Sequence, residues 1–358
     1  MHRFLALPCV LALAWFGTMA HAGDTDAYDG YDLSPQAARV DLGVQPLGYP
    51  TGLVGAAMGR DRILRGALAE QGLSLQTLAF RRGPDIVDRL GGQRLEAGLV
   101  GDMPTLAAIA AGDTLVAGVV KFSTSAVVSR EIGLMANLRG RRIAYVEGSS
   151  AHYTLLEGLA SAGLKEADVE LVPMPVNDMP DALREGRVSA FAAWEPAPAI
   201  ALAQDPAHRI VFRGRSTDYL LISRQFADTR PEAARQLTAA LVRAIRWMQR
   251  RRDNIETAAR WAMADGVRLA GEPAQASLSQ AVNITRTELL DIPALPTIPA
   301  SARGMQGLGG KLKFLQHRGK IPTHIGANEV EQAFDYAGLA EVQSAPAKYR
   351  LNNFDYGR

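Results

Sequence analysis

Residues 138–196 read LRGRRIAYVEGSSAHYTLLEGLASAGLKEADVELVPMPVNDMPDALREGRVSAFAAWEP. Short apolar runs rich in β-branched residues alternate here with longer segments of helical periodicity. The pattern predicts, in order, a strand at 142–146, a helix at 153–162, a strand at 169–172, a helix at 179–184 and a strand at 190–194. Such an alternation builds a mostly parallel sheet covered by helices. The stretch therefore predicts one α/β lobe.

The same alternation occurs once before, nearer the start of the chain. It predicts a strand at 40–44, a helix at 52–71, a strand at 75–80, a helix at 85–90 and a strand at 96–100. A connection near residues 121–131 joins the two halves. A duplicated α/β pattern predicts two lobes with a ligand cleft between them, because ligands bind such sheets outside the carboxyl ends of the strands.

Two helical segments follow the second half, at residues 231–251 and 255–264. Residues 291–304 read DIPALPTIPASARG, and three prolines exclude a long helix there. We expect this stretch to wrap over the surface.

The first 22 residues have the features of a secretory signal peptide. A basic start precedes an apolar run at 4–20, and the small residues Ala20 and Ala22 flank a predicted cut between Ala22 and Gly23. The run is short for a membrane span of roughly 20 residues. Residues 23–38 are polar and Gly-rich, which indicates a flexible leader. We expect an exported, periplasmic protein.

Composition narrows the classes of partner. The formal net charge is +2, so no strong field points to nucleic acid or to a membrane surface, and small solutes are the expected partners. The four histidines beyond residue 22 lack metal-ligand spacing, the single cysteine lies at position 9, and no G-x-S-x-G motif occurs. The sequence predicts neither a cofactor nor a metal, and it favours a binding protein over an enzyme.

Three loops between a predicted strand and a predicted helix have small or Gly-rich residues. They are 45–52 (QPLGYPTG), 101–105 (GDMPT) and 147–153 (EGSSAHY). A helix N-terminus presents unpaired N–H groups and about half a positive charge, so it attracts anions. Thr51, Ser149 and Ser150 add hydroxyl donors, which predicts a small anionic ligand. Asp102 has an alternative role as a cap of its own helix, and each hydroxyl has the alternative of an ordinary helix cap.

Side chains near these loops have two possible roles each. His152 and Tyr49 are predicted to donate to ligand oxygens or stack on the ligand body, or else to pack locally. Trp194 either walls the cleft or belongs to the core. Glu195 either pairs with an arginine or receives a ligand ammonium, and Arg82 is a possible fork for an anion.

At these residues the chain resembles a known family. Arg82-Gly83-Pro84-Asp85, Gly101-Asp102-Met103-Pro104 and the whole block 138–196 are similar to the nitrate/sulfonate/taurine class of substrate-binding proteins of ABC importers. The aliphatic sulfonate-binding members resemble it most. The resemblance implies a type II periplasmic-binding-protein fold, with two α/β lobes joined by a hinge. Lobe I would hold residues 39–122 and 224–358, and lobe II residues 123–223.

The resemblance also implies ligand contacts, a partner and a mode of action. The ligand would meet the three loops, the crossing between the lobes and the wall formed by Trp194. Those positions are Leu47, Gly48, Tyr49, Thr51, Asp102, Met103, Ser123, Thr124, Ser149, Ser150, His152 and Trp194, with Arg82 and Glu195 as ligand or hinge partners. A monomer would capture a small anion, without catalysis, and deliver it to an ABC permease in the inner membrane.

Several alternatives remain open at this point. The ligand is an alkane- or aryl-sulfonate, taurine, nitrate or a neutral heterocycle such as a thiamine precursor. An exported enzyme on the same fold and a periplasmic sensor subunit are the alternatives from other classes.

Overall fold

The fold was analysed in a computed structural model, which describes residues 28, 30–33, 38–92, 94–290 and 308–357. The predicted signal peptide, most of the predicted leader and the predicted wrap-around segment lie outside these residues. The chain divides into two units, residues 1–32 and 33–358. In the first unit, the Tyr31 amide donates to the Tyr28 carbonyl at 3.0 Å. All that follows concerns the second unit.

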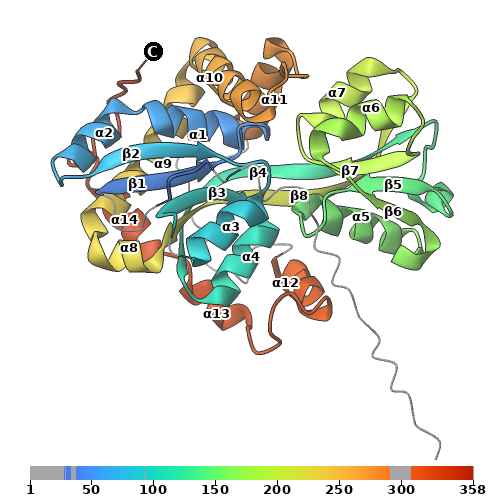
Figure 1. The fold of residues 1–358 in the computed structure, drawn as a ribbon, viewed down its shortest axis with the longest axis horizontal. Coiled ribbons are helices and arrows are strands. Elements are labelled where there is room, and N and C mark those ends of the chain that lie inside the picture. Colours follow the sequence, from blue (N-terminus) through green and yellow to red (C-terminus); the bar gives the residue numbers. More distant parts are fainter. Residues whose placement is uncertain (1–27, 29, 34–37, 93, 291–307, 358) are drawn as a thin grey trace, which may run out of the picture. The chain divides into compact units, whose positions relative to one another are not determined.

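The first α/β half is the one predicted near the start of the chain (Figure 1). Its elements are β1 (Arg39–Val44), α1 (Thr51–Arg60), α2 (Arg62–Ala69), β2 (Ser74–Ala79), α3 (Gly83–Gly91), β3 (Ala97–Gly101) and α4 (Asp102–Ala111). The second half follows after the long strand β4 (Thr114–Arg130). It comprises β5 (Arg142–Tyr145), α5 (Ser150–Ser161), β6 (Glu170–Pro173), α6 (Met179–Arg184), β7 (Ala190–Ala193) and α7 (Ala197–Gln204), with short 3₁₀ turns at Met135–Leu138, Glu166–Asp168 and Val176–Asp178.

The chain then returns along β8 (His208–Ser223) and ends in helices. These are α8 (Arg224–Thr229), α9 (Pro231–Arg250), α10 (Arg252–Ala270), α11 (Leu278–Leu290), α12 (Leu308–His317), α13 (Ala327–Gln332) and α14 (Tyr336–Ser344). Among the described residues, none of the helices has both the length and the apolar composition needed to cross a membrane.

The eight strands of the described residues join one sheet in the order β2-β1-β3-β8-β4-β7-β5-β6. The strands within each half are parallel, as predicted, whereas β4 and β8 run antiparallel to each other along their whole length. One end of this pair borders β3 and the other borders β7, so both strands continue from one half into the other (Figure 1). The α/β architecture predicted from the sequence is confirmed.

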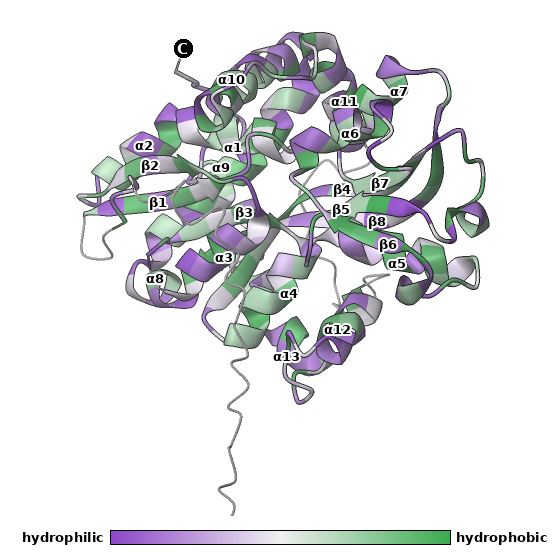
Figure 2. Cartoon of the chain, turned by 45° about the vertical axis from the view of Figure 1, so that its right-hand side comes forward, coloured by the Kyte–Doolittle hydropathy of each residue, from purple (hydrophilic) through white to green (hydrophobic). Residues whose placement is uncertain are grey.

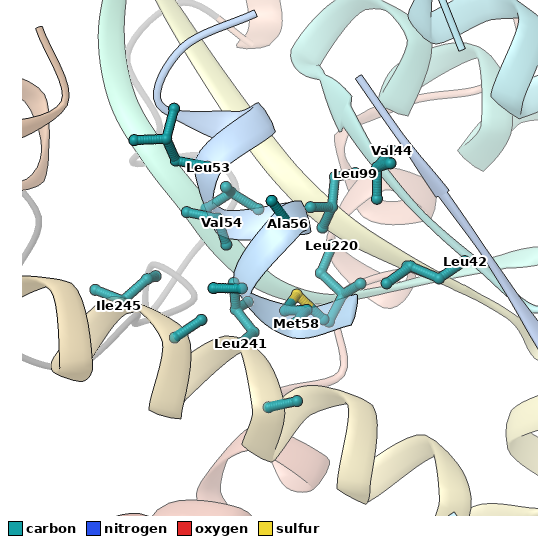
Figure 3. Close-up of a cluster of buried hydrophobic side chains, with 14 of the residues drawn as sticks. Leu42, Val44, Leu53, Val54, Ala56, Met58, Leu99, Leu220, Leu241 and Ile245 are labelled. Atoms are coloured by element: carbon teal, nitrogen blue, oxygen red, sulfur yellow. The ribbon is translucent and has the colours of Figure 1, made fainter. Parts of the chain in front are cut away.

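Each half has its own apolar core. In the first half, side chains from β1, α1, β3, β8 and α9 meet in the cluster drawn in Figure 3. In the second half, Ala126 and Val128 lie in one cluster and Val127 in another, because successive strand residues point to opposite faces. Helices therefore cover both faces of that sheet, and hydrophilic and hydrophobic residues alternate along them (Figure 2).

The helix predicted at 52–71 is wrong in one respect. The structure breaks it at Asp61, whose extended backbone separates α1 from α2 and whose side chain accepts from the amides of Ile63 and Leu64. Asp61 also forms a fully buried ion pair with Arg243 of α9, at 2.7 Å. A buried charge requires a partner, so the aspartate holds the chain there and starts a new helix.

The connection predicted near residues 121–131 does join the two halves, and it is extended. That segment belongs to β4, a single strand of 17 residues. Pairing of Lys121 with Asp218 and of Ser123 with Ser216 in the register with β8 explains why the segment is extended.

Candidate functional site

A pocket lies where loops of both halves meet the crossing strands. The space between its walls is about 530 Å³, a volume that includes open solvent. Its walls come from the carboxyl ends of five parallel strands and from the middle of β4 and β8. The lining residues are Gln45, Gly48, Thr51, Arg82, Gly83, Pro84, Gly101, Pro104, Lys121, Val146, Ser149, Ser150, Trp194, Ser216 and Asp218. The pocket thus occupies the position at which α/β sheets bind ligands.

The loop before α5 supplies two buried hydroxyls. Ser149 caps the helix by accepting from the His152 amide at 3.2 Å, and its own hydroxyl donates to the Val146 carbonyl at 2.7 Å. Gly148 has a φ of +72°, a backbone conformation that glycine adopts without steric cost. Ser150, the first residue of α5, lines the pocket beside Ser149. The N-terminus of α5, with its partial positive charge, therefore faces the pocket.

Gly48 and Trp194 bring the two halves together at another wall. A Cβ atom on Gly48 would lie 3.2 Å from Nε1 of Trp194, so the indole packs against the glycine backbone. Next to this contact, the Tyr49 amide donates to the Glu195 carbonyl at 3.0 Å. The loop after β1 and the end of β7 are thereby linked across the pocket.

Charges gather at the crossing strands. Lys121 is almost fully buried, and its Nζ lies 3.7 Å from Asp218 Oδ2 and 4.0 Å from Glu288 Oε2. Burial lowers the pKa of Lys121, but the carboxylates around it, Asp218 and Glu288 first and then Asp102 and Glu195, outweigh burial and the net shift is upward. Burial raises the pKa of Asp218, an effect that Lys121 and a hydrogen bond from Thr51 oppose. Burial also raises the pKa of Glu288, to about 7, although Lys121 opposes the shift. The lysine thus remains a cation in the pocket wall.

Comparison with known proteins places this architecture in a family. The sequence profile of the NMT1-like family matches residues 34–263. The chain belongs to the NMT1-like family.

Two comparisons concern binding proteins. This NMT1-like chain is 30% identical, over 207 residues, to a protein of Escherichia coli strain K12 named as a putative aliphatic sulfonates-binding protein. That match covers 56% of the chain and 59% of the relative, so the chain spans less than two thirds of the relative's length. The alkanesulfonate-binding protein SsuA from Xanthomonas axonopodis pv. citri, solved with bound MOPS, has a similar fold. The TM-score is 0.63 at 23% identity, covering 83% of this chain and 98% of SsuA.

An enzyme shares the fold as well. The desulfurization enzyme DSZB superposes with a TM-score of 0.55 at 17% identity, covering 86% of this NMT1-like chain and 99% of the enzyme. The fold alone therefore does not separate binding from catalysis.

Some of the side chains predicted to meet a ligand line the pocket. They are Gly48, Thr51, Ser149, Ser150, Trp194 and the possible partner Arg82, which also pairs with Asp85 at 2.7 Å. Their contact with ligand stays a prediction.

The other predicted positions do not line the pocket. Met103 and Tyr49 are buried, and burial raises the pKa of Tyr49 to about 12. Leu47 approaches Gly266 of α10. Ser123 accepts from Lys121 Nζ at 3.2 Å, and Thr124 accepts from Arg213 at 3.3 Å, so both lie at the crossing.

His152 and Glu195 have partners within their own half. The His152 ring packs on Tyr145 at 4.5 Å between centroids, and its Nδ1 accepts from the Gly148 amide at 3.3 Å. Burial lowers the pKa of His152 to about 4, so the ring is neutral at pH 7. Glu195 accepts from the Ala199 amide in the first turn of α7, at 3.1 Å. Glu195 forms no direct ion pair with an arginine among the described residues. Burial raises the pKa of Glu195, and the charge of Arg213 opposes that rise.

Asp102 does not cap its own helix, and its contact with ligand stays a prediction. Gly101 is the cap position of α4, and Asp102 is the first helical residue. Its Oδ1 accepts from Ser150 at 2.5 Å, and its Oδ2 accepts from Lys311 Nζ at 2.5 Å and from the Thr217 amide at 3.1 Å. Protein donors therefore occupy both carboxylate oxygens.

Sequence reasoning missed several residues of the site. Lys121 and Asp218 are charged residues inside strands, and Gln45 and Ser216 are further polar lining residues. A single charged residue within a long run of β-branched and apolar residues, as in TLVAGVVKF at 114–122, was the available signal. Lys311 and Glu288, which come from the C-terminal helices, had no such signal.

Proposed function

We propose that this protein is a periplasmic solute-binding protein that captures a small organic sulfonate, or a close anionic analogue, and delivers it to an ABC permease. The observation that supports the proposal most is the arrangement of the pocket. The N-terminus of α5 with Ser149 and Ser150 lies on one side, and the ammonium of Lys121 lies on another. A sulfonate presents three acceptor oxygens and one negative charge, which match the backbone N–H groups at the N-terminus of α5 and the ammonium of Lys121.

The mode of action follows from the crossing strands. Walls from both halves meet at the pocket, so a ligand that contacts both would stabilise the form in which they approach each other. β4 and β8 are the segments about which such a hinge motion would occur. We place the lobe boundaries there, at residues 122/123 and 223/224. The proposal includes no covalent step.

The names of the relatives agree with this proposal. A relative named for aliphatic sulfonates is 30% identical over the matched region, and another curated relative, 27% identical over 185 residues, is named a taurine-binding periplasmic protein. Both names describe binding of sulfonates, and the second also names the periplasm. The predicted signal peptide, with its cut between Ala22 and Gly23, fits an exported receptor.

A thermal-shift panel tests the ligand class. The full chain is expressed with its predicted signal peptide, purified from the periplasmic fraction, and stripped of ligand by unfolding and refolding. Mass spectrometry of that product should show Gly23 as the first residue. Ethanesulfonate is compared with ethanesulfonamide, which has the same skeleton without the charge, and with taurine, nitrate, sulfate and a thiamine-precursor heterocycle.

The proposal predicts stabilisation by ethanesulfonate and little effect of the sulfonamide. Ligand at 100 times its dissociation constant adds about 2.7 kcal/mol, or roughly 4 °C for a chain of this length. A midpoint raised only by the neutral heterocycle would overturn the proposal.

A further inference from the structure

α12 carries a buried lysine to the edge of the pocket. Lys311 is 3% exposed, and its Nζ donates to Asp102 Oδ2 at 2.5 Å and to the Arg215 carbonyl at 2.7 Å. The helix lies beyond residues 34–263, which match the family profile. Figure 1 shows it beside α4, on the same side of the sheet as α5. Lys311 thus reaches the site from a part of the chain that the profile does not include.

Contacts with the second half hold α12 in place. The Phe314 ring meets His152 edge-on at 5.7 Å and Tyr153 at 5.5 Å between centroids. Arg318, which follows the helix, forms an ion pair with Glu166. The ammonium of Lys311 also lies 5.6 Å from the centre of the Tyr153 ring. The position of Lys311 is therefore fixed by packing on both sides of the pocket.

The carboxylate that Lys311 meets lies directly behind the pocket wall. Asp102 is 1% exposed, and its neighbour Gly101 lines the pocket. Its Oδ1 accepts from Ser150, itself a lining residue. The buried negative charge of Asp102, directly behind the pocket wall, would repel an anion at the N-terminus of α5, because little solvent lies between the two charges to screen the repulsion. The ammonium of Lys311 cancels that charge.

We infer that Lys311 is a specificity-determining residue, which neutralises Asp102 and so lets the α5 end of the pocket accept an anion. The inference rests on the proposed function. It assigns Lys311 a positioning and charge-compensating role, because its ammonium acts on the ligand through Asp102 and Ser150. In the absence of Lys311, the charge of Asp102 would lower the affinity of the same pocket for anions and leave its affinity for neutral ligands unchanged.

The experiment compares four variants with the wild-type chain, each expressed with the predicted signal peptide and stripped of ligand. Lys311→Met removes the cation that pairs directly with Asp102, Asp102→Asn removes the carboxylate that pairs directly with Lys311, and the double variant removes both charges. Lys313→Met changes an exposed lysine of the same helix and is the matched control. Titration calorimetry measures the dissociation constants of ethanesulfonate and of ethanesulfonamide, and thermal midpoints report folding.

The inference predicts a ranking of the variants by ethanesulfonate affinity that a merely structural role of Lys311 would not produce. Lys311→Met weakens ethanesulfonate binding about 30-fold or more, the usual effect of leaving one charge of a buried pair alone. The double variant recovers most of that affinity, Asp102→Asn binds the sulfonate at least as tightly as the wild type, and Lys313→Met changes nothing. Sulfonamide binding stays within a few-fold throughout.

Three results would overturn the inference. One is sulfonate binding by Lys311→Met at wild-type affinity. Another is an equal loss for sulfonate and sulfonamide that the double variant does not recover. If Lys311→Met does not fold, Asp102→Asn decides the matter, and weaker sulfonate binding in that variant contradicts the inference. A wild-type chain that binds no anion would instead refute the proposed function, and the inference with it.

Discussion

Ser150 donates a hydrogen bond to Asp102 at 2.5 Å, which joins the first turns of α5 and α4 across the pocket. This bond would stabilise the closed form of the protein, in which the two halves meet around a bound ligand. Ser150→Ala removes the bond and a lining hydroxyl, so we expect sulfonate affinity to fall roughly tenfold, as for loss of a hydrogen bond to a charged group. Titration calorimetry measures it. Ser161→Ala, near the end of α5, is the control, and equal affinities for both variants would contradict the role of Ser150.

Lys121 supplies the buried cation of the pocket, and its removal has two separable effects. Lys121→Met leaves Asp218 and Glu288 without their shared partner, so the free energy of unfolding should fall by about 3–5 kcal/mol. Adding Asp218→Asn should restore much of this stability. It should not restore sulfonate binding, because the ammonium is still missing. Denaturant melts and calorimetry of both variants test the two effects, and sulfonate binding by the double variant would contradict the assignment.

The parts of the site that follow from local sequence were predictable. Ser149, Ser150 and Thr51 stand between a recognisable strand and a recognisable helix, so their place at the carboxyl edge of a sheet follows from the alternation alone. Gly48 and Trp194 were found for the same reason. The α/β halves and most of their elements are local patterns of this kind.

The missed parts depend on contacts between distant segments. Lys121 and Asp218 lie in β4 and β8, and they come together only through the pairing of these two strands, which are distant in sequence. Asp102 meets Lys311 across 209 positions of the chain. No periodicity reports such a contact, because a buried charge and an exposed one look alike in sequence. Conversely, His152 lies in one of the three predicted ligand loops, but its ring packs on Tyr145 and Phe314.

The neutral state of His152 makes stability depend on pH. Its pKa is lowered to about 4 in the fold against about 6.5 in the unfolded chain. The unfolded state therefore binds more protons between these values, and stability is full above about pH 6.5 and falls as the pH drops toward 4. The loss from this group is about 3 kcal/mol.

Replacing His152 by asparagine keeps an acceptor for the Gly148 amide and removes the titration. Denaturant melts at pH 7 and pH 4.5 should show a smaller decrease for His152→Asn than for the wild type. His317→Asn, on the surface of α12, should behave like the wild type. Identical pH dependence in His152→Asn and the wild type would show that the ring is not held neutral.

Glu288 predicts a second pH effect, on ligand binding. Its pKa is raised to about 7, and Lys121, Asp218 and Glu195 surround it. A protonated Glu288 leaves more of the Lys121 charge for an anion, so sulfonate affinity should rise several-fold as the pH falls from about 8 to about 6. Glu288→Gln should bind tightly at both values, whereas the exposed Glu272→Gln should follow the wild type. Calorimetry at the two pH values checks this, and a falling wild-type affinity at lower pH would contradict it.

The most direct test of the account is a calorimetric titration of the stripped wild-type protein with ethanesulfonate, followed by mass spectrometry of the recovered ligand. The account predicts saturation at one ligand per chain and recovery of ethanesulfonate unchanged. Absence of binding under conditions where a neutral heterocycle saturates the protein, or recovery of a desulfonated product, would contradict it.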